Sequence, residues 1–339
     1  MREKSKSIRD YILQLAKENT PALATKAAEH FHMSVQAIIR HVKKAEQEGL
    51  ITTTGGGRLK KYALANIEVL KWEFDREGLR EDAVWREKIQ PLLDGLPENV
   101  RDTWHYGVTE MVNNAVDHSE GKTVSVYFER TALDITIWIA DDGEGIFHRV
   151  QRLLGLYDPR ESILELAKGK LTTDPANHSG EGIFFTSRVF DHFAILSRNL
   201  YFSHEAEKRD WLIQYESDRP GTTIKLTLAN NTTKTLNEVM DFYAAPDEFT
   251  FSKTTVPVRL ATHEGEKLVS RSQAKRLVAR FEKFKTVILD FDAVEEIGQA
   301  FADEIFRVFA NNHPETELIP LHTTKEVKQM ISRAINREA

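Results

Sequence analysis

The chain of 339 residues has 41% hydrophobic residues, enough to bury a core and to build two or three domains. It contains no cysteine, which excludes disulfides, thiolate zinc sites and cysteine nucleophiles and fits a reducing cytoplasm. No apolar run reaches the roughly 18 residues of a membrane span, and the charged, amphipathic first helix has no signal-peptide stretch. We therefore expect a globular, cytoplasmic protein with no membrane partner.

Positive charge is concentrated at the N-terminus. Residues 1–65 carry 12 Lys or Arg against 6 Asp or Glu, a net charge of +6, and the remaining residues carry −12, which together give the chain's −6. Only the N-terminal segment is therefore suited to a polyanionic partner such as DNA.

The N-terminal segment reads as three helices and a hairpin. Helices are expected over 6–17 and 22–31, on either side of "NTP", and a third in "MSVQAIIRHVKKAEQEGL", with Ser34 as its N-cap. The following "ITTTGGGRLKKYAL" places two β-prone runs around three glycines, a hairpin signal.

This order of elements resembles a winged helix-turn-helix, in which the third helix enters the major groove and the hairpin, or wing, touches the DNA backbone. A basic module that binds protein or dimerises is the alternative left open. On the DNA interpretation, the contacts come from Gln36, Arg40, His41, Lys43 and Lys44 on the third helix and from Arg58, Lys60 and Lys61 on the wing.

The rest of the chain alternates strands and helices. In the middle region, "YFER" and "DITIWIA" predict strands, and 79–94 and 97–118 predict helices. After residue 250, "TTVPVRLATH", "KTVILDFD" and "TELIPL" predict strands alternating with helices at 267–282, 299–312 and 324–336, as in a small α/β domain. The expected fold is multidomain α+β, with domains at 1–65, 66–230 and 250–339.

The helix at 97–118 carries an unusual polar face in "EMVNNAVDH". Glu110 and Asn114 are four residues apart and share one face, where a carboxylate and an amide oxygen could orient water and complete the shell of Mg²⁺. Asn113 either helps to position the metal or caps a backbone group. His118 and Asp117 are candidates to contact phosphate or ribose; the alternative is that a histidine near a helix end is a capping or surface residue.

Three glycine-containing turns accompany this helix. In "IWIADDGEGIF" a strand ends at Asp141, followed by Gly143 and Gly145, so that a carboxylate stands beside backbone that a flat ligand can approach. In "SGEGIF", Gly180 and Gly182 open an apolar helix whose N–H groups attract phosphate. The third turn, "RPGTTIKLTL", runs into a strand.

Across about residues 66–230, these segments together resemble the GHKL superfamily of ATP-binding domains, found in gyrase, histidine kinases, mismatch-repair ATPases and anti-sigma-factor kinases. The resemblance implies ATP and Mg²⁺ as cofactors and a lid over about 147–179. By resemblance, the site residues are Glu110 as general base, Asn114 as Mg²⁺ ligand, Asp141 as acceptor of the adenine amine, Gly143, Gly145 and Thr223 as walls of the adenine pocket, and Gly180 and Gly182 beside the phosphates.

Two lysines of this lid, Lys168 and Lys170, are candidates to neutralise the terminal phosphate; the alternative is an ordinary solvated helix face. No Gly-x4-Gly-Lys-Ser/Thr sequence occurs, which removes the P-loop interpretation.

Residues from about 250 to 330 resemble a STAS-like domain of unknown function, related to anti-anti-sigma factors. Signalling STAS proteins carry a phosphorylatable serine after the "LDF"-type strand, whereas here the loop reads Ile297, Gly298, Gln299, Ala300. The missing acceptor favours docking of a protein partner, or a purely structural dimerisation lobe, over a phosphorylation switch.

Two functions fit this organisation. The first is an ATP-binding, ATP-hydrolysing DNA-binding regulator, with a homodimer left open. The second is a serine/threonine protein kinase of the anti-sigma-factor type acting on a separate STAS-domain partner. A histidine kinase is disfavoured because no helical hairpin with an acceptor histidine precedes the ATP-binding region.

Overall fold

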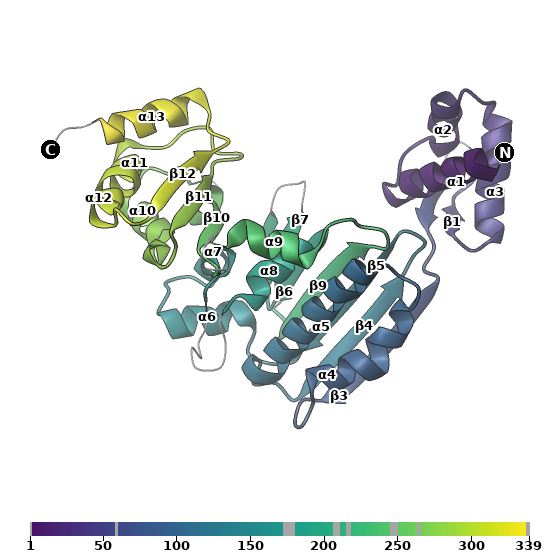
Figure 1. Ribbon diagram of the computed structural model, residues 1–339, viewed down its shortest axis with the longest axis horizontal. Coiled ribbons are helices and arrows are strands. Elements are labelled where there is room, and N and C mark those ends of the chain that lie inside the picture. The colour runs from purple at the N-terminus through teal and green to yellow at the C-terminus, as the bar shows by residue number, and fades with distance from the viewer. Residues whose placement is uncertain are drawn as a thin grey trace.

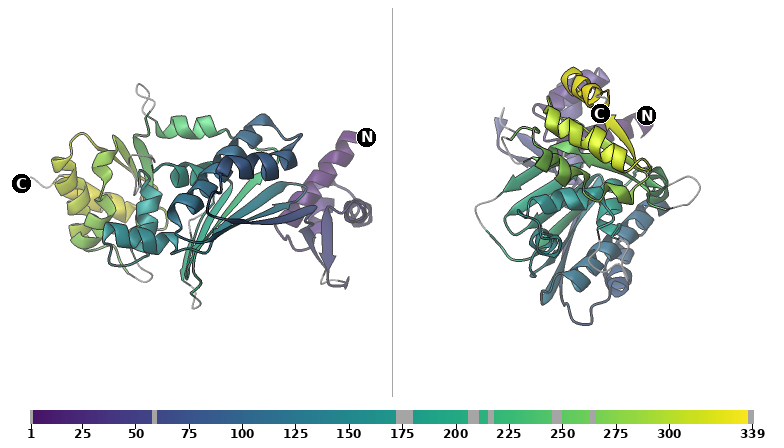
Figure 2. Two further views of the ribbon diagram at one scale, coloured as in Figure 1. Left: turned by 90° about the horizontal axis from the view of Figure 1, so that it is seen from below. Right: turned by 90° about the vertical axis from the view of Figure 1, so that its left-hand side faces the viewer.

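Three structural units follow one another along the chain (Figure 1). The computed structural model describes residues 2–57, 60–171, 180–205, 211–214, 218–244, 250–262 and 266–336. The units are a small helical domain with a hairpin, a seven-stranded sheet with helices on one face, and a three-stranded domain at the opposite end of the molecule (Figures 1 and 2). Each unit is centred on its own cluster of buried apolar side chains.

The N-terminal unit has the predicted three helices and antiparallel hairpin. Its first helix begins at Arg2 rather than at residue 6, because "REKSK" continues the helix with residues that tolerate it. Ser34 caps the third helix, since its hydroxyl accepts a hydrogen bond from the Ala37 N–H. The elements are α1 (Arg2–Lys17), α2 (Leu23–Phe31), α3 (Val35–Gln47), β1 (Ile51–Thr54) and β2 (Lys61–Leu64).

The central sheet is antiparallel throughout, in the order β3-β4-β5-β9-β6-β7-β8. Alternate residues of its inner strands are buried, which matches a sheet covered on one face. The strands are β3 (Glu68–Asp75), β4 (Thr123–Arg130), β5 (Asp134–Asp141), β6 (His192–Ser197), β7 (Leu200–Glu205), β8 (Trp211–Gln214) and β9 (Thr222–Ala229).

The covering helices are led by α5 (Glu98–His118), whose apolar stripe, including Trp104, Val108 and Met111, is fully buried. The helix predicted at 79–94 consists of three consecutive short segments, which are α-helical, π-helical and 3-10-helical. These segments and the remaining helices are α4 (Glu81–Val84), η2 (Trp85–Ile89), η3 (Gln90–Leu93), α6 (Ile146–Leu154), α7 (Glu161–Lys168), α8 (Gly182–Val189) and α9 (Leu236–Tyr243).

The C-terminal unit is a parallel sheet in the order β10-β11-β12 with helices around it. The helix predicted at 267–282 is shorter, since Ser270 and Gln273 form a capping box at its start and Arg280 turns the chain at a φ of 69° after its end. The elements are β10 (Lys253–Pro257), η4 (Val258–Ala261), α10 (Arg271–Val278), η5 (Phe281–Lys283), β11 (Thr286–Asp290), α11 (Gln299–Asp303), η6 (Glu304–Phe309), α12 (Ala310–Asn312), β12 (Glu317–Leu321) and α13 (Lys325–Ile335).

Both outer units are attached to the central one by side-chain contacts. Lys17 of α1 forms an ion pair with Asp134, the first residue of β5, with 2.8 Å between Nζ and Oδ2. Leu133, in the same β4–β5 turn, packs against the N-terminal core. At the other end, Leu164 of α7 and Phe184 of α8 are part of the buried cluster of the C-terminal unit. Within the described ranges, no helix has the combined length and hydropathy that crossing a bilayer requires.

Candidate functional site

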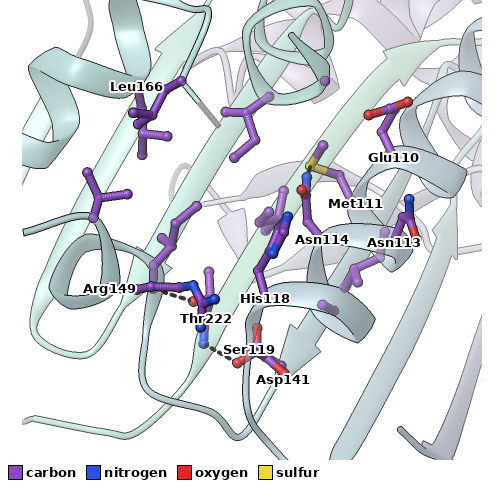
Figure 3. A pocket seen from close by; sticks show the side chains of 18 of the residues that line it. Glu110, Met111, Asn113, Asn114, His118, Ser119, Asp141, Arg149, Leu166 and Thr222 are labelled. Atoms are coloured by element: carbon purple, nitrogen blue, oxygen red, sulfur yellow. Dashed lines mark hydrogen bonds between the residues drawn. The ribbon is translucent and has the colours of Figure 1, made fainter. Parts of the chain in front are cut away.

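A cavity of about 310 Å³ opens between α5, α6, the turn before α8 and the sheet (Figure 3). This volume lies in the range of small-molecule sites. Its polar and charged lining residues are Glu110, Asn113, Asn114, His118, Ser119, Asp141, Arg149 and Thr222, and its apolar lining includes Ile139, Leu166, Leu171, Phe184 and Ile224.

Asp141 stands at the end of β5 with one carboxylate oxygen already engaged. Its Oδ1 accepts hydrogen bonds from the Gly143 N–H at 2.9 Å and the Thr222 N–H at 3.2 Å. Burial raises the pKa of this carboxyl to about 6, because desolvation outweighs the two backbone hydrogen bonds that favour the charged form. The backbone thus fixes the side chain through Oδ1, and no described residue donates a hydrogen bond to Oδ2.

Gly143 contributes through packing. A Cβ on Gly143 would lie 1.9 Å from the carbonyl oxygen of Ser119, so any larger residue would push apart the turn after β5 and the end of α5. The described lining of the cavity includes the neighbouring Gly145 rather than Gly143.

The polar face of α5 supplies four residues to the cavity. Glu110, Asn113, Asn114 and His118 line it, while Asp117 is exposed to solvent. Glu110 and Asp141 lie at opposite ends of the labelled group in Figure 3. One ligand could therefore meet the Asp141 carboxylate at one end and the Glu110 carboxylate at the other.

The Glu110 end of the cavity meets the start of α8. A Cβ on Gly182 would come within 1.9 Å of Glu110 Oε2, so the absence of a side chain allows the carboxylate to stand beside the helix N-terminus. Burial first, and then the negative charges of Glu110 and Glu181, raise the pKa of the Tyr106 hydroxyl. Negative charge is therefore concentrated at the Glu110 end of the cavity, which favours the binding of a divalent cation there.

The donor set fits Mg²⁺ that is bound together with a phosphate ligand. Among the described residues no group of three or more His, Cys, Asp or Glu could hold a metal by itself. A carboxylate and amide oxygens are available at Glu110, Asn113 and Asn114, and Mg²⁺ commonly completes such a small protein shell with phosphate and water.

Thr222 occupies the place expected for Thr223. Its N–H donates to Asp141, and its Oγ1 accepts the Ile146 N–H at 2.9 Å, which ties β9 to the start of α6. Thr223 is next along the strand, and successive side chains of a strand point to opposite faces. Ile224 is buried, so Thr222, two residues earlier, lies on the same face of the strand. The apolar Ile224 was therefore the feature of the sequence that could have identified Thr222.

Arg149 is a lining residue that the sequence interpretation missed. It lies one turn after the start of α6, and its Nη1 pairs with Glu120 Oε1 at 2.7 Å. It is a cation at the cavity wall, where an anionic ligand would benefit from it.

Lys168 and Lys170 do not line the described cavity, and Lys168 is not on a solvated face. Lys168 is fully buried and donates to the carbonyl oxygens of Arg276 and Ala279 in the C-terminal unit. Lys170 donates to the carbonyl oxygen of Lys283. Of the expected lid, residues 172–179 lie outside the described residues.

The candidate DNA-binding residues of the third helix share one exposed surface. Of the candidate residues on α3 and the wing, Gln36, Arg40, Lys43, Lys44, Lys60 and Lys61 are exposed. His41 is half-buried, and Arg58 lies outside the described residues.

Two family models match parts of the chain. Residues 79–200 match the histidine kinase-like ATPase domain, and residues 273–331 match the STAS-like domain of unknown function. A comparison with curated proteins found no match. The cavity lies within the first of these regions and the strand that completes it. The central unit is thus a histidine-kinase-like ATPase domain of the GHKL type, and the C-terminal unit contains a STAS-like domain.

Proposed function

We propose that this protein is a DNA-binding regulator whose central domain binds and hydrolyses Mg²⁺–ATP. The observation that carries the proposal is the Asp141 carboxylate, whose Oδ1 is held by two backbone amides while Oδ2 is left for a ligand. A carboxylate oxygen accepts the exocyclic amine of adenine but repels the carbonyl oxygen that guanine carries at that position. The site is therefore suited to ATP rather than GTP.

The opposite end of the cavity supplies the groups that the phosphates need. Asn114 would hold Mg²⁺, which neutralises phosphate charge when bound, and the N-terminus of α8 at Gly182 would receive phosphate oxygens. Glu110 would accept the proton of an attacking water as general base.

The N-terminal domain supports the DNA-binding part. Three helices followed by a hairpin place Arg40, Lys43 and Lys44 on the exposed face of α3, and the wing adds Lys60. A net charge of +6 on residues 1–65 favours a polyanion, through release of the counterions condensed on DNA.

Strand β5 joins the two functions. Its first residue, Asp134, pairs with Lys17 of the N-terminal domain, and its last residue, Asp141, is the proposed adenine acceptor. A preference of ATP for one arrangement of the domains worth only about 1.4 kcal/mol would change DNA affinity tenfold.

Labelled ATP tests the catalytic assignment. The protein is incubated with γ-labelled ATP and Mg²⁺, and free phosphate is separated from labelled protein. We expect free phosphate from the parent chain, and loss of hydrolysis by about 10²-fold or more in Glu110→Gln with ATP binding retained. Parental hydrolysis by Glu110→Gln would remove Glu110 from the reaction. Label transferred to a STAS-domain protein would support the serine/threonine kinase alternative, in which Glu110 serves a hydroxyl instead of water.

A further inference from the structure

One wall of the cavity is fastened to the C-terminal domain. Residues 161–171, here called the wall segment, comprise α7 and the turn after it, and contribute Leu166 and Leu171 to the cavity lining. We infer that docking of the C-terminal domain positions this wall segment, so that nucleotide binding and domain docking strengthen each other. The inference rests on the proposed nucleotide site and adds its regulation.

Lys168 is the first part of the attachment. Its ammonium group is fully buried and donates to Glu165 Oε1 at 2.7 Å, to Arg276 O at 2.9 Å and to Ala279 O at 3.0 Å. The last two are carbonyl oxygens at the C-terminal end of α10, where helix carbonyls lack partners within the helix and the helix dipole favours a cation. The side chain of Lys168 in the wall segment thus supplies hydrogen bonds to the terminal carbonyl groups of helix α10 in the other domain.

Arg280 makes the reciprocal contact from the C-terminal domain. Its Nη1 pairs with Glu165 Oε2 at 2.7 Å, and its Nη2 donates to the carbonyl oxygens of Gly169 at 2.7 Å and Lys170 at 2.6 Å. Glu165 therefore receives both cations, one on each oxygen. Because the pair is buried, removing one partner leaves a charge without compensation, which is far costlier than losing a surface ion pair.

Apolar contacts to the C-terminal cluster are made both by the wall segment, at Gly169, and by Phe184 of the adjoining helix α8. Phe184 lines the cavity and lies 4.6 Å, between ring centroids, from Phe251 of the C-terminal cluster. A Cβ on Gly169 would lie 2.8 Å from the Phe251 ring, so the turn after α7 is held against this ring. Displacing the C-terminal domain would remove the support of a residue that faces the nucleotide.

The connection ends beside the phosphate end of the site. Leu171 donates its N–H to the carbonyl oxygen of Gly180 at 3.2 Å, and Gly180 leads directly into α8, where Glu110 meets Gly182. Movement of the wall segment is thus linked through Leu171 to the backbone that would receive phosphate.

Calorimetry and hydrogen exchange on the full-length chain test this coupling. The variants are Lys168→Met and Arg280→Met. The matched control is Lys267→Met, because Lys267 pairs with Glu296 on the exposed surface of the same domain. We expect both variants to weaken Mg²⁺–ATP binding about tenfold or more, within the usual range of coupling between sites, and the control to change it less than twofold. In the parent chain, ATP should slow amide exchange in α10 and η5, which do not line the described cavity.

The result that overturns the inference is equally specific. If ATP leaves exchange in α10 and η5 of the parent chain unchanged, the domains are not coupled, and this measurement needs no variant to fold. ATP affinity within twofold of the parent in Lys168→Met, with exchange showing an opened interface, leads to the same conclusion. Failure of the parent chain to bind ATP at all would instead reject the proposed function.

Discussion

The adenine end of the cavity depends on the chemistry of one side chain. In Asp141→Asn, the amide oxygen would keep the hydrogen bonds from Gly143 and Thr222, so the NH₂ group would face the adenine amine, donor against donor. We expect ATP affinity to fall on the order of 10²-fold, the cost of an unsatisfied buried donor together with the removal of a charged acceptor. Calorimetry measures it. Unchanged ATP binding, or equal ATP and GTP affinities in the parent chain, would reject the assignment.

The same carboxyl predicts a pH dependence. Burial raises the pKa of Asp141 to about 6, so the carboxylate that accepts the adenine amine is present above pH 6 and is lost as the pH falls through it. The ATP dissociation constant should rise about tenfold per pH unit below 6. The control is Glu144→Gln. Arg152 holds the pKa of Glu144 below its usual range, so Glu144 stays charged near pH 6, and its replacement should leave the pH dependence unchanged. Affinity that stays constant from pH 7 to pH 5 would contradict the proposed role of Asp141.

Sequence reasoning named most of the polar and charged residues that line the cavity, but few of its apolar ones. Glu110 and Asn114 share a helix face, and Asp141 and Gly145 share one turn, so the proximity within each pair follows from spacing. The joining of these segments into one site came from the resemblance to GHKL domains. The sequence assignment chose Thr223 instead of Thr222. Because successive side chains of a strand alternate between its faces, a shift of one residue selects the wrong face.

Helix α3 is the element on which DNA binding depends. Arg40→Ala combined with Lys44→Ala should weaken duplex binding and reduce the salt slope by about 0.9 for each phosphate that the variant no longer neutralises. The control combines Lys6→Ala with Arg9→Ala, which removes the same charge from exposed positions of α1. Titrations of fluorescent duplex at several salt concentrations compare the two. Equal weakening by both variants would mean that the total charge, rather than α3, determines binding.

The start of a helix was predictable where a capping residue was recognised in the sequence. Ser34 was recognised as the N-cap of α3, whereas the capping box of Ser270 and Gln273 was overlooked, so the helix that contains α10 was predicted to start at 267. The burial of α7 was not predictable, since Glu165 and Lys168 look like an exposed pair on a helix surface. Their partners Arg280 and Arg276 lie 115 and 108 residues further along the chain, beyond any local pattern.

At the scale of the whole molecule, the contact between Lys17 and Asp134 should transmit the effect of ATP to the DNA-binding domain. Lys17→Met would remove the ion pair while leaving the cavity and α3 unchanged. We expect the ratio of DNA affinities with and without ATP to move toward one, although ATP affinity without DNA stays within twofold of the parent. Affinity measurements on all four combinations of ligand and variant give this ratio. A ratio equal to the parent's would show that coupling uses another route.

The sharing of Phe184 and Leu164 with the C-terminal core has a consequence for dissecting the protein. A chain cut near residue 230 would keep every strand of the central sheet, yet it would expose the apolar side of α7 and α8 to water and deprive Lys168 of its carbonyl partners. An exposed patch of this kind promotes aggregation. The boundary between the two family matches is therefore not a boundary between independently stable units. We expect the ATPase domain to stay soluble only when residues 250–336 remain attached to it.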